Sequence, residues 1–187
     1  MGRDHQARVH DAVLPAARDG QAAGLVANNL PAALRAGSYT HAIPVDVLTE
    51  IEIARPREDV AAYAADPDNA TAWYVNIEAV EWQTPKPLVV GSRVAFVARF
   101  LGRRLAYTYE IRELVPRERL VMSTSAGPFP METTYEWSDA DGGGTRMTLR
   151  NRGEPSGFAK VGAPVLAAAM RRANRKDLER LKAILER

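Results

Sequence analysis

The chain has 187 residues, of which 46% are hydrophobic and 26% are charged, and its 25 basic and 23 acidic side chains leave a formal charge of +2. These proportions are typical of a globular protein: no apolar run approaches the roughly 18 residues of a membrane span, and a nucleic-acid partner would require a larger basic excess. Cysteine is absent, which excludes disulfides and thiolate metal sites and fits a reducing, cytoplasmic location.

Residues 1–46 differ in character from the rest of the chain. They are rich in alanine and glycine, and their basic and acidic residues balance. Short helices fit around Ala7–Ala17 and Gln21–Arg35, but neither has a wide apolar stripe. A secretory signal is disfavoured because acidic residues interrupt the segment. We therefore expect a flexible or irregular extension over 1–46 and one domain over 47–187.

The domain is expected to begin with a strand and two short helices. Val47–Ala54 alternates apolar and polar side chains, which is typical of a half-buried strand. Pro56 suits the first position of a helix, and acidic residues follow where the helix dipole favours them. The turn at Asp66–Asp68 ends this helix and opens a second one, which carries Trp73.

A period of two residues then predicts six further strands, separated by turns rich in proline and glycine. The expected strands are Ile77–Gln83, Arg93–Phe100, Arg104–Arg112, Leu120–Ser125, Phe129–Trp137 and Thr145–Asn151. The glycines at 142–144 indicate a hairpin turn rather than a phosphate loop, because no Gly-Lys pair and no helix start follow them.

The last element is predicted to be a long helix over Gly157–Arg187, with Pro164 kinking it or dividing off its first turns. Its apolar side is expected to contain Phe158, Val161, Val165, Ala169, Ala173, Leu178, Leu181 and Leu185. Six basic residues against Asp177, Glu179 and Glu186 predict a basic outer face, which is either simply solvated or in weak contact with an anionic membrane surface.

This order of elements predicts an α+β helix-grip fold, in which a curved antiparallel sheet of about seven strands wraps around the long C-terminal helix, with two short helices after the first strand. The apolar face of the sheet needs a cover, and only the last helix is long enough to supply it. A gap between a curved sheet and one helix is a common place for a ligand.

Local sequences within this arrangement resemble the polyketide cyclase/dehydrase and lipid-transport family of the START-like (Bet v 1-like, SRPBCC) superfamily. The segments that carry the resemblance are Ile51–Val60, Asp66–Trp73, Pro87–Arg93, Gly127–Met131, Gly142–Leu149 and Arg175–Lys182. The resemblance spans essentially all of 47–187 and implies the helix-grip fold. Known members include aromatase/cyclases, lipid carriers and hormone-binding proteins, so the fold does not choose among these functions.

The domain offers little recognisable catalytic chemistry. All three histidines, His5, His10 and His41, lie in the extension, so no histidine-based acid, base or metal centre is expected in the domain. No metal and no other cofactor is expected. Tyr107 and Tyr109 are the candidates for a general acid, and the plain strand alternation points Arg99 and Arg150 to solvent.

The concave face of the sheet and the facing side of the helix are expected to line a cavity, although for each single residue a filled core is the alternative. The expected ligand-binding residues are Trp73, Phe96, Ala98, Phe100, Tyr107, Tyr109, Met122, Thr124, Phe129, Met131, Thr133, Tyr135, Met147, Leu149, Phe158, Val161, Val165 and Ala169. Tyr107, Tyr109, Thr124, Thr133 and Asn151 supply the hydrogen-bonding groups. Trp73 is either a gate at the entrance or a structural anchor.

Two functions therefore remain open. We favour the binding or transport of a small hydrophobic or aromatic, lipid- or polyketide-like ligand, because the expected cavity is apolar and lacks strong catalytic groups. The alternative is an aromatase/cyclase or dehydratase that folds a polyketide-like intermediate and moves protons through a tyrosine or an arginine. No nucleic-acid partner is expected, and the chain is either a monomer or a homodimer.

Overall fold

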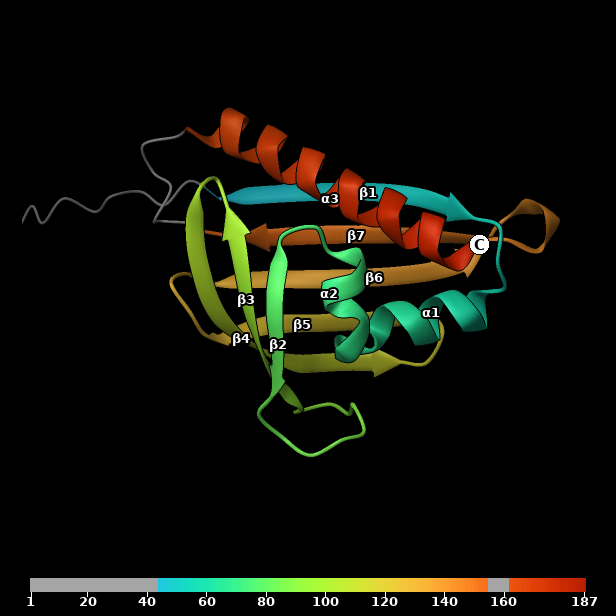
Figure 1. Cartoon of the computed structure of the whole chain (residues 1–187), viewed down its shortest axis with the longest axis horizontal. Coiled ribbons are helices and arrows are strands. Elements are labelled where there is room, and N and C mark those ends of the chain that lie inside the picture. The colour runs from blue at the N-terminus through green and yellow to red at the C-terminus, as the bar shows by residue number, and fades with distance from the viewer. Residues whose placement is uncertain (1–43, 155–161) are drawn as a thin grey trace, which may run out of the picture. The chain divides into compact units, whose positions relative to one another are not determined.

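The computed structural model describes residues 44–154 and 162–187 (Figure 1). Most of the predicted extension and the predicted positions Phe158 and Val161 lie outside the described residues. The elements are β1 (Val45–Ile53), α1 (Arg57–Ala65), the 3-10 helix η2 (Pro67–Asn69), α2 (Ala70–Trp73), β2 (Ile77–Trp82), β3 (Arg93–Phe100), β4 (Arg103–Val115), β5 (Arg119–Ala126), β6 (Met131–Asp139), the 3-10 helix η3 (Asp141–Gly143), β7 (Thr145–Gly153) and α3 (Ala163–Leu185).

The strands form one antiparallel sheet of seven strands in the order β1-β7-β6-β5-β4-β3-β2, which confirms the predicted helix-grip arrangement. β1 begins two residues before its predicted start, because buried Val45 continues the alternation and pairs with Gly153 of β7. The register shifts within β2 and at two places where β4 pairs with β5. Such irregularities bend strands, and in Figure 1 β2, β3 and part of β4 curl away from the plane of the other strands.

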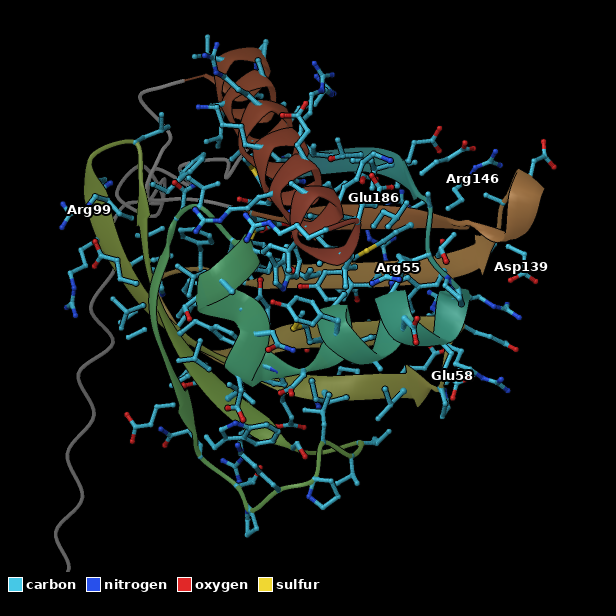
Figure 2. The ribbon with its side chains drawn as sticks, turned by 45° about the vertical axis from the view of Figure 1, so that its right-hand side comes forward. Arg55, Glu58, Arg99, Asp139, Arg146 and Glu186 are labelled. Carbon is cyan, nitrogen blue, oxygen red and sulfur yellow. The ribbon has the colours of Figure 1, made fainter. Side chains whose placement is uncertain are left out.

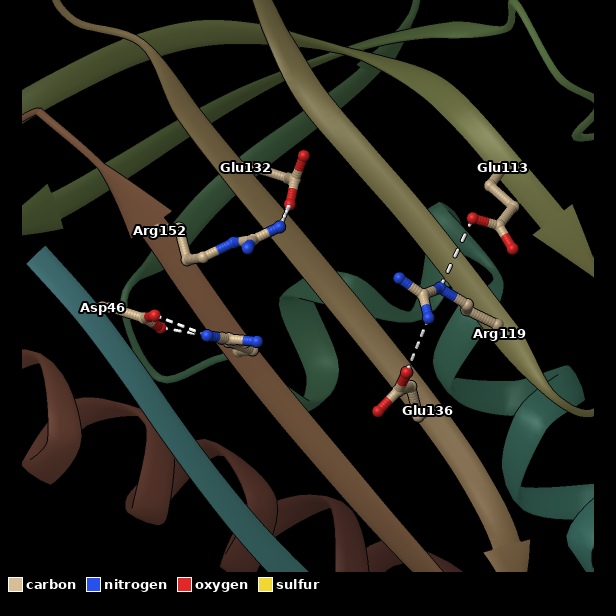
Figure 3. A network of polar contacts seen from close by, with 7 residues as sticks. Asp46, Glu113, Arg119, Glu132, Glu136 and Arg152 are labelled. Carbon is tan, nitrogen blue, oxygen red and sulfur yellow. Dashed lines mark hydrogen bonds and ion pairs between the residues drawn. The ribbon is translucent and has the colours of Figure 1, made fainter.

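Side chains with charge gather on the face of the sheet that is turned away from α3 (Figure 3). There Arg150 of β7 donates to the carboxylate of Asp46 on β1 at 2.8 and 2.5 Å, and Arg152 pairs with Glu132 on β6. Exposed pairs of this kind contribute at most about 1 kcal/mol each. These charged residues lie on the solvent-facing side of the sheet, and the apolar side chains lie on the opposite face.

The helix α3 covers that opposite face. It begins at Ala163 with Pro164 in its first turn, where a proline's missing N–H costs no hydrogen bond. Pro164 therefore opens the described helix and does not kink it. The buried residues of α3 are Leu166, Met170, Asn174, Asp177, Leu178 and Leu181.

This buried face differs from the predicted one in the first half of the helix. Val165 is 61% exposed, whereas its neighbour Leu166 is 4% exposed. The predicted inward position of Val165 is thus wrong, and Ala169 is only half-buried, with Met170 inside in its place. The physical reason is that residues 165–170 are all apolar, so their periodicity cannot select a face.

The end of α3 is joined to the end of β1 by hydrogen bonds to backbone atoms. The N–H of Ala54 donates to the carboxylate of Glu186 at 2.6 Å, and the side chain of Lys182 donates to the carbonyl oxygen of Glu52 at 2.6 Å. Arg55 donates to the carbonyl oxygen of Leu185 at 2.5 Å, and Figure 2 shows Arg55 and Glu186 at this end of the helix. These bonds fix the C-terminal end of the helix against the first strand.

The buried apolar residues form two clusters. The larger one packs α1, α2 and the second half of α3 against the sheet around Trp73 and Trp137, and the smaller one joins Val45 and Val47 to Leu166 and Met170. In the larger cluster the short helices and α3 together close one end of the sheet's concave face.

The face of α3 can be tested with two neighbouring truncations. We expect Leu166→Ala to lower the free energy of unfolding by about 2–3 kcal/mol, since a buried leucine loses its contacts. Val165→Ala should change it by less than about 0.5 kcal/mol, since the side chain is exposed. Urea denaturation followed by circular dichroism measures both, and a larger loss for Val165→Ala would mean that the helix is rotated from the described orientation.

Candidate functional site

A cavity of about 160 Å³ lies between α3 and the concave face of the sheet. Among the predicted ligand-binding residues, those at its wall are Phe96, Ala98, Phe100, Tyr107, Tyr109, Met122, Thr124, Phe129, Met131, Thr133 and Tyr135. These residues come from the strands β3 to β6 and the loop before β6. The period-two pattern of the strands therefore brings most of the predicted set together around one space.

Other predicted residues lie away from the cavity wall. Met147 and Leu149 face the same side of the sheet but are fully buried in the larger apolar cluster, because that end of the sheet is filled by the helices. Trp73 is 1% exposed and its ring lies 3.9 Å from that of Tyr74, so it is an anchor in the core rather than a gate. Val165 and Ala169 do not line the cavity.

Asn151, predicted to supply a hydrogen-bonding group, also lines the cavity. Other wall residues were not among the predicted ligand contacts. They are Tyr74, Asn76, Ile77, Leu105, Pro128, Leu166, Met170, Ala173, Asn174 and Asp177. Leu105 follows the strand alternation that predicts the concave face, and so carried a usable signal. Asn174 and Asp177 carried none, because polar residues on a helix are ordinarily assigned to its wet face.

The cavity changes in character along the helix. Its wall on α3 runs from Leu166 and Met170 to Asn174 and Asp177, a spacing that keeps all four on one face. Eleven residues at 1.5 Å per residue separate the first from the last by about 16 Å. One end is therefore apolar and the other end polar.

The apolar end lies near the loop between β5 and β6. Pro128 and Phe129 of this loop line the cavity, and Pro128 is exposed, so the cavity approaches the surface here. The loop crosses directly over β4: a Cβ atom on Gly127 would lie 2.9 Å from the Cβ of Tyr107, and φ is +156° at this glycine. Only glycine allows that close approach without a shift of the backbone.

A chain of hydrogen bonds links the sheet to the helix across the cavity wall. Thr133 donates to the Oδ1 atom of Asn151 at 2.7 Å, and the Nδ2 atom of Asn151 donates to Oδ1 of Asn174 at 3.1 Å. Tyr109 lies 2.9 Å from the Thr133 oxygen, and since the single proton of Thr133 is already committed, Tyr109 is the donor. Within the described residues, the buried Nδ2 atom of Asn174 has no partner.

The polar end contains two more tyrosines and a carboxylate. The hydroxyls of Tyr74 and Tyr135 are hydrogen-bonded to each other. Asp177 is 3% exposed, and its Oδ1 atom accepts the N–H of Val75 at 2.8 Å. The predicted place of Asp177 on the outer face of the helix is therefore wrong, although Arg171, Arg172, Arg175 and Lys176 are exposed there as expected.

Burial controls the protonation of these groups. It raises the pKa of Asp177 to about 6, against the smaller opposing effects of the Val75 N–H and the charge of Arg180. It also raises the pKa of Tyr109 to about 12 and that of Tyr74, Tyr107 and Tyr135 further above the usual range. At neutral pH the four tyrosines are thus neutral, and among the described residues of the cavity wall Asp177 is the group that titrates near neutral pH.

Two kinds of functional feature are absent from the part of the chain that the structure describes. No group of three or more histidine, cysteine, aspartate or glutamate side chains is placed to hold a metal ion. No described helix is long and apolar enough to cross a membrane.

The buried carboxylate should be visible in the pH dependence of stability. Because the pKa of Asp177 is raised from 3.8 to about 6 on folding, the free energy of unfolding should fall as pH rises between these values. Asp177→Asn removes the titrating carboxyl, so the free energy of unfolding of the variant should exceed that of the wild type by up to about 3 kcal/mol at pH 7 and by almost nothing at pH 4. Glu179→Gln, on the exposed side of the same helix, is the control; equal pH profiles for Asp177→Asn and the wild type would contradict the assignment.

The model of the family "Polyketide cyclase / dehydrase and lipid transport" matches residues 44–186. No curated protein sequence matches the chain.

Solved structures share the fold at low sequence identity. The Zhui aromatase/cyclase from Streptomyces sp. R1128 is 18% identical, with a TM-score of 0.65, over 78% of this chain and 95% of that one. A START superfamily protein from Mycobacterium smegmatis is 13% identical, with a TM-score of 0.65 and coverage of 75% and 97%. The major latex-like protein 151 of Panax ginseng is 14% identical, with a TM-score of 0.60 and coverage of 75% and 96%. By the family match over almost all of its described residues, and in keeping with its fold, the chain belongs to the polyketide cyclase/dehydrase and lipid-transport family.

Proposed function

We propose that this chain binds a small hydrophobic or aromatic ligand in the cavity between the sheet and α3, as a carrier or sensor. The observation that supports the proposal most directly is a cavity of about 160 Å³ whose wall is mainly apolar and aromatic. An engineered cavity of about 150 Å³ with a similar apolar lining binds benzene. Burial of apolar surface would supply the affinity.

The protonation of the tyrosines favours binding over catalysis. A general acid works best when its pKa lies near the working pH. Burial raises the pKa of Tyr107 and Tyr109 further above neutral pH, to about 12 for Tyr109. The predicted role of these two residues is therefore better met by hydrogen bonding to a ligand than by proton transfer.

Catalysis of a cyclisation or dehydration is the second candidate, and one observation favours it. Asp177 combines burial in the cavity wall with a pKa of about 6, which is suited to a general base near neutral pH. The Zhui aromatase/cyclase, which has a similar fold, is named for a reaction of this class. Turnover of a supplied poly-β-keto substrate, lost in Asp177→Asn, would establish this candidate over the carrier.

A cavity-filling substitution tests the proposal. Ala173 lines the cavity, whereas Ala168 lies on the exposed side of the same helix. We expect Ala173→Phe to weaken the binding of a neutral apolar fluorophore such as N-phenyl-1-naphthylamine at least about tenfold, the equivalent of 1.4 kcal/mol. Ala168→Phe should leave binding unchanged, and thermal melts of both variants report on folding.

Equal binding by the two variants would place the fluorophore elsewhere and contradict the proposal. Native mass spectrometry of the purified chain gives a separate test, since a bound hydrophobic compound that is released on denaturation would identify the ligand class. The predicted cytoplasmic location, the oligomeric state and a weak membrane contact through the basic side of α3 stay predictions.

A further inference from the structure

We infer that the ligand carries a protonated amine at one end, and that this group pairs with Asp177 at the polar end of the cavity. This inference rests on the proposed function and names the chemical class of its ligand: a small apolar or aromatic amine, bound with the amine at the polar end of the cavity.

The first argument is the incomplete set of partners around Asp177. Its carboxylate is 3% exposed and accepts one hydrogen bond, from the N–H of Val75 at 2.8 Å. An ionised carboxylate has about four acceptor positions. Among the described residues Asp177 has no ion pair, although the charge of Arg180 acts on it. Buried charges in proteins are ordinarily paired, so the cavity itself is where a cation would complete the set.

The second argument is the aromatic surroundings. The rings of Phe96, Tyr107 and Tyr109 form one group, with centroids 5.9 Å apart for Phe96 and Tyr107 and 5.2 Å apart for the two tyrosines. Tyr74 and Tyr135 bring two further rings to the same wall. Aromatic faces attract cations, and more strongly where water is excluded. A carboxylate among aromatic rings therefore favours an ammonium group over a neutral head.

The third argument separates the amine from other amphiphiles. The carboxylate of a fatty acid would meet the like charge of Asp177 and would have to be neutralised first. An alcohol would donate one hydrogen bond but bring no opposite charge. Because the other end of the cavity is lined by Phe100, Phe129 and Leu166, the apolar part of the ligand belongs there and the head belongs at Asp177.

The test uses three probes that share one phenyl ring and differ in the head: 2-phenylethylamine, 2-phenylethanol and 3-phenylpropionate. Isothermal titration calorimetry of the full chain at pH 7.5 should give an affinity for the amine at least about tenfold above that for the alcohol, and the weakest binding for the acid. In Asp177→Asn the ratio of amine to alcohol affinity should fall to about one or below. Glu179→Gln, exposed on the same helix, should keep the wild-type ratio.

A pH series with the wild type gives a second measurement that needs no variant. The groups around Asp177 are Tyr74 after α2, Tyr107 on β4, Tyr135 on β6 and Arg180 on α3. Between pH 5 and 7.5 the tyrosines stay neutral, and both the guanidinium and the amine stay positively charged. Amine affinity should therefore rise with pH through the region near 6, where Asp177 ionises, while alcohol affinity should rise less or fall.

The outcomes separate this inference from the proposed function. If the alcohol binds as well as the amine, or if Asp177→Asn keeps the amine preference, the inference is wrong and the proposed function stands. Stronger binding of the acid would also overturn it and would point to an anionic ligand. If none of the three probes binds and the neutral fluorophore does not bind either, both proposals fail.

Discussion

The structure depends on a mismatch of width between one helix and the sheet that it covers. Seven strands at about 4.8 Å spacing extend over roughly 29 Å, whereas a helix with its side chains is about 10–12 Å across. The sheet curls around α3, and α1 and α2 fill part of the remaining width beside it. Where those short helices stop, side chains from both apolar clusters face each other across a space that none of them fills.

The same constraint distributes polar groups. Strand alternation sends the charged residues of the sheet to the outer face, where they pair across strands as Asp46 and Arg150 do. Inside, a buried polar group is costly unless it has a hydrogen-bond partner, either in the wall or in the contents of the cavity. The series of hydrogen bonds from Tyr109 to Asn174 gives most of these side chains a partner. Asp177 remains as the one ionisable carboxyl at the described cavity wall.

The sheet could be predicted from the sequence because its information is local and has a period of two. Every strand was found within a few residues of its bounds, and Phe96, Tyr107 and Thr133 were placed on the concave face because alternation leaves only two choices. The helix was harder. Residues 165–170 are all apolar, so the sequence does not show which side of the helix is buried there. Asp177 is buried, against the usual rule that charged side chains face water. The extent of the cavity also depends on where α1 and α2 end against the sheet, which no local pattern encodes.

The hydrogen bonds that join the last turn of α3 to the end of β1 hold this end of the helix, so a change in the tilt of the helix would have its pivot here. Leu166 lies nineteen residues from Leu185, about 28 Å along the axis, and Asp177 lies eight residues away, about 12 Å. A tilt of about 5° around the pivot would move Leu166 by about 2.5 Å but Asp177 by only about 1 Å. Such a lever would hold the geometry of head-group recognition nearly constant while the wide end adjusts to tails of different thickness, so selectivity would reside in the head and tolerance in the tail.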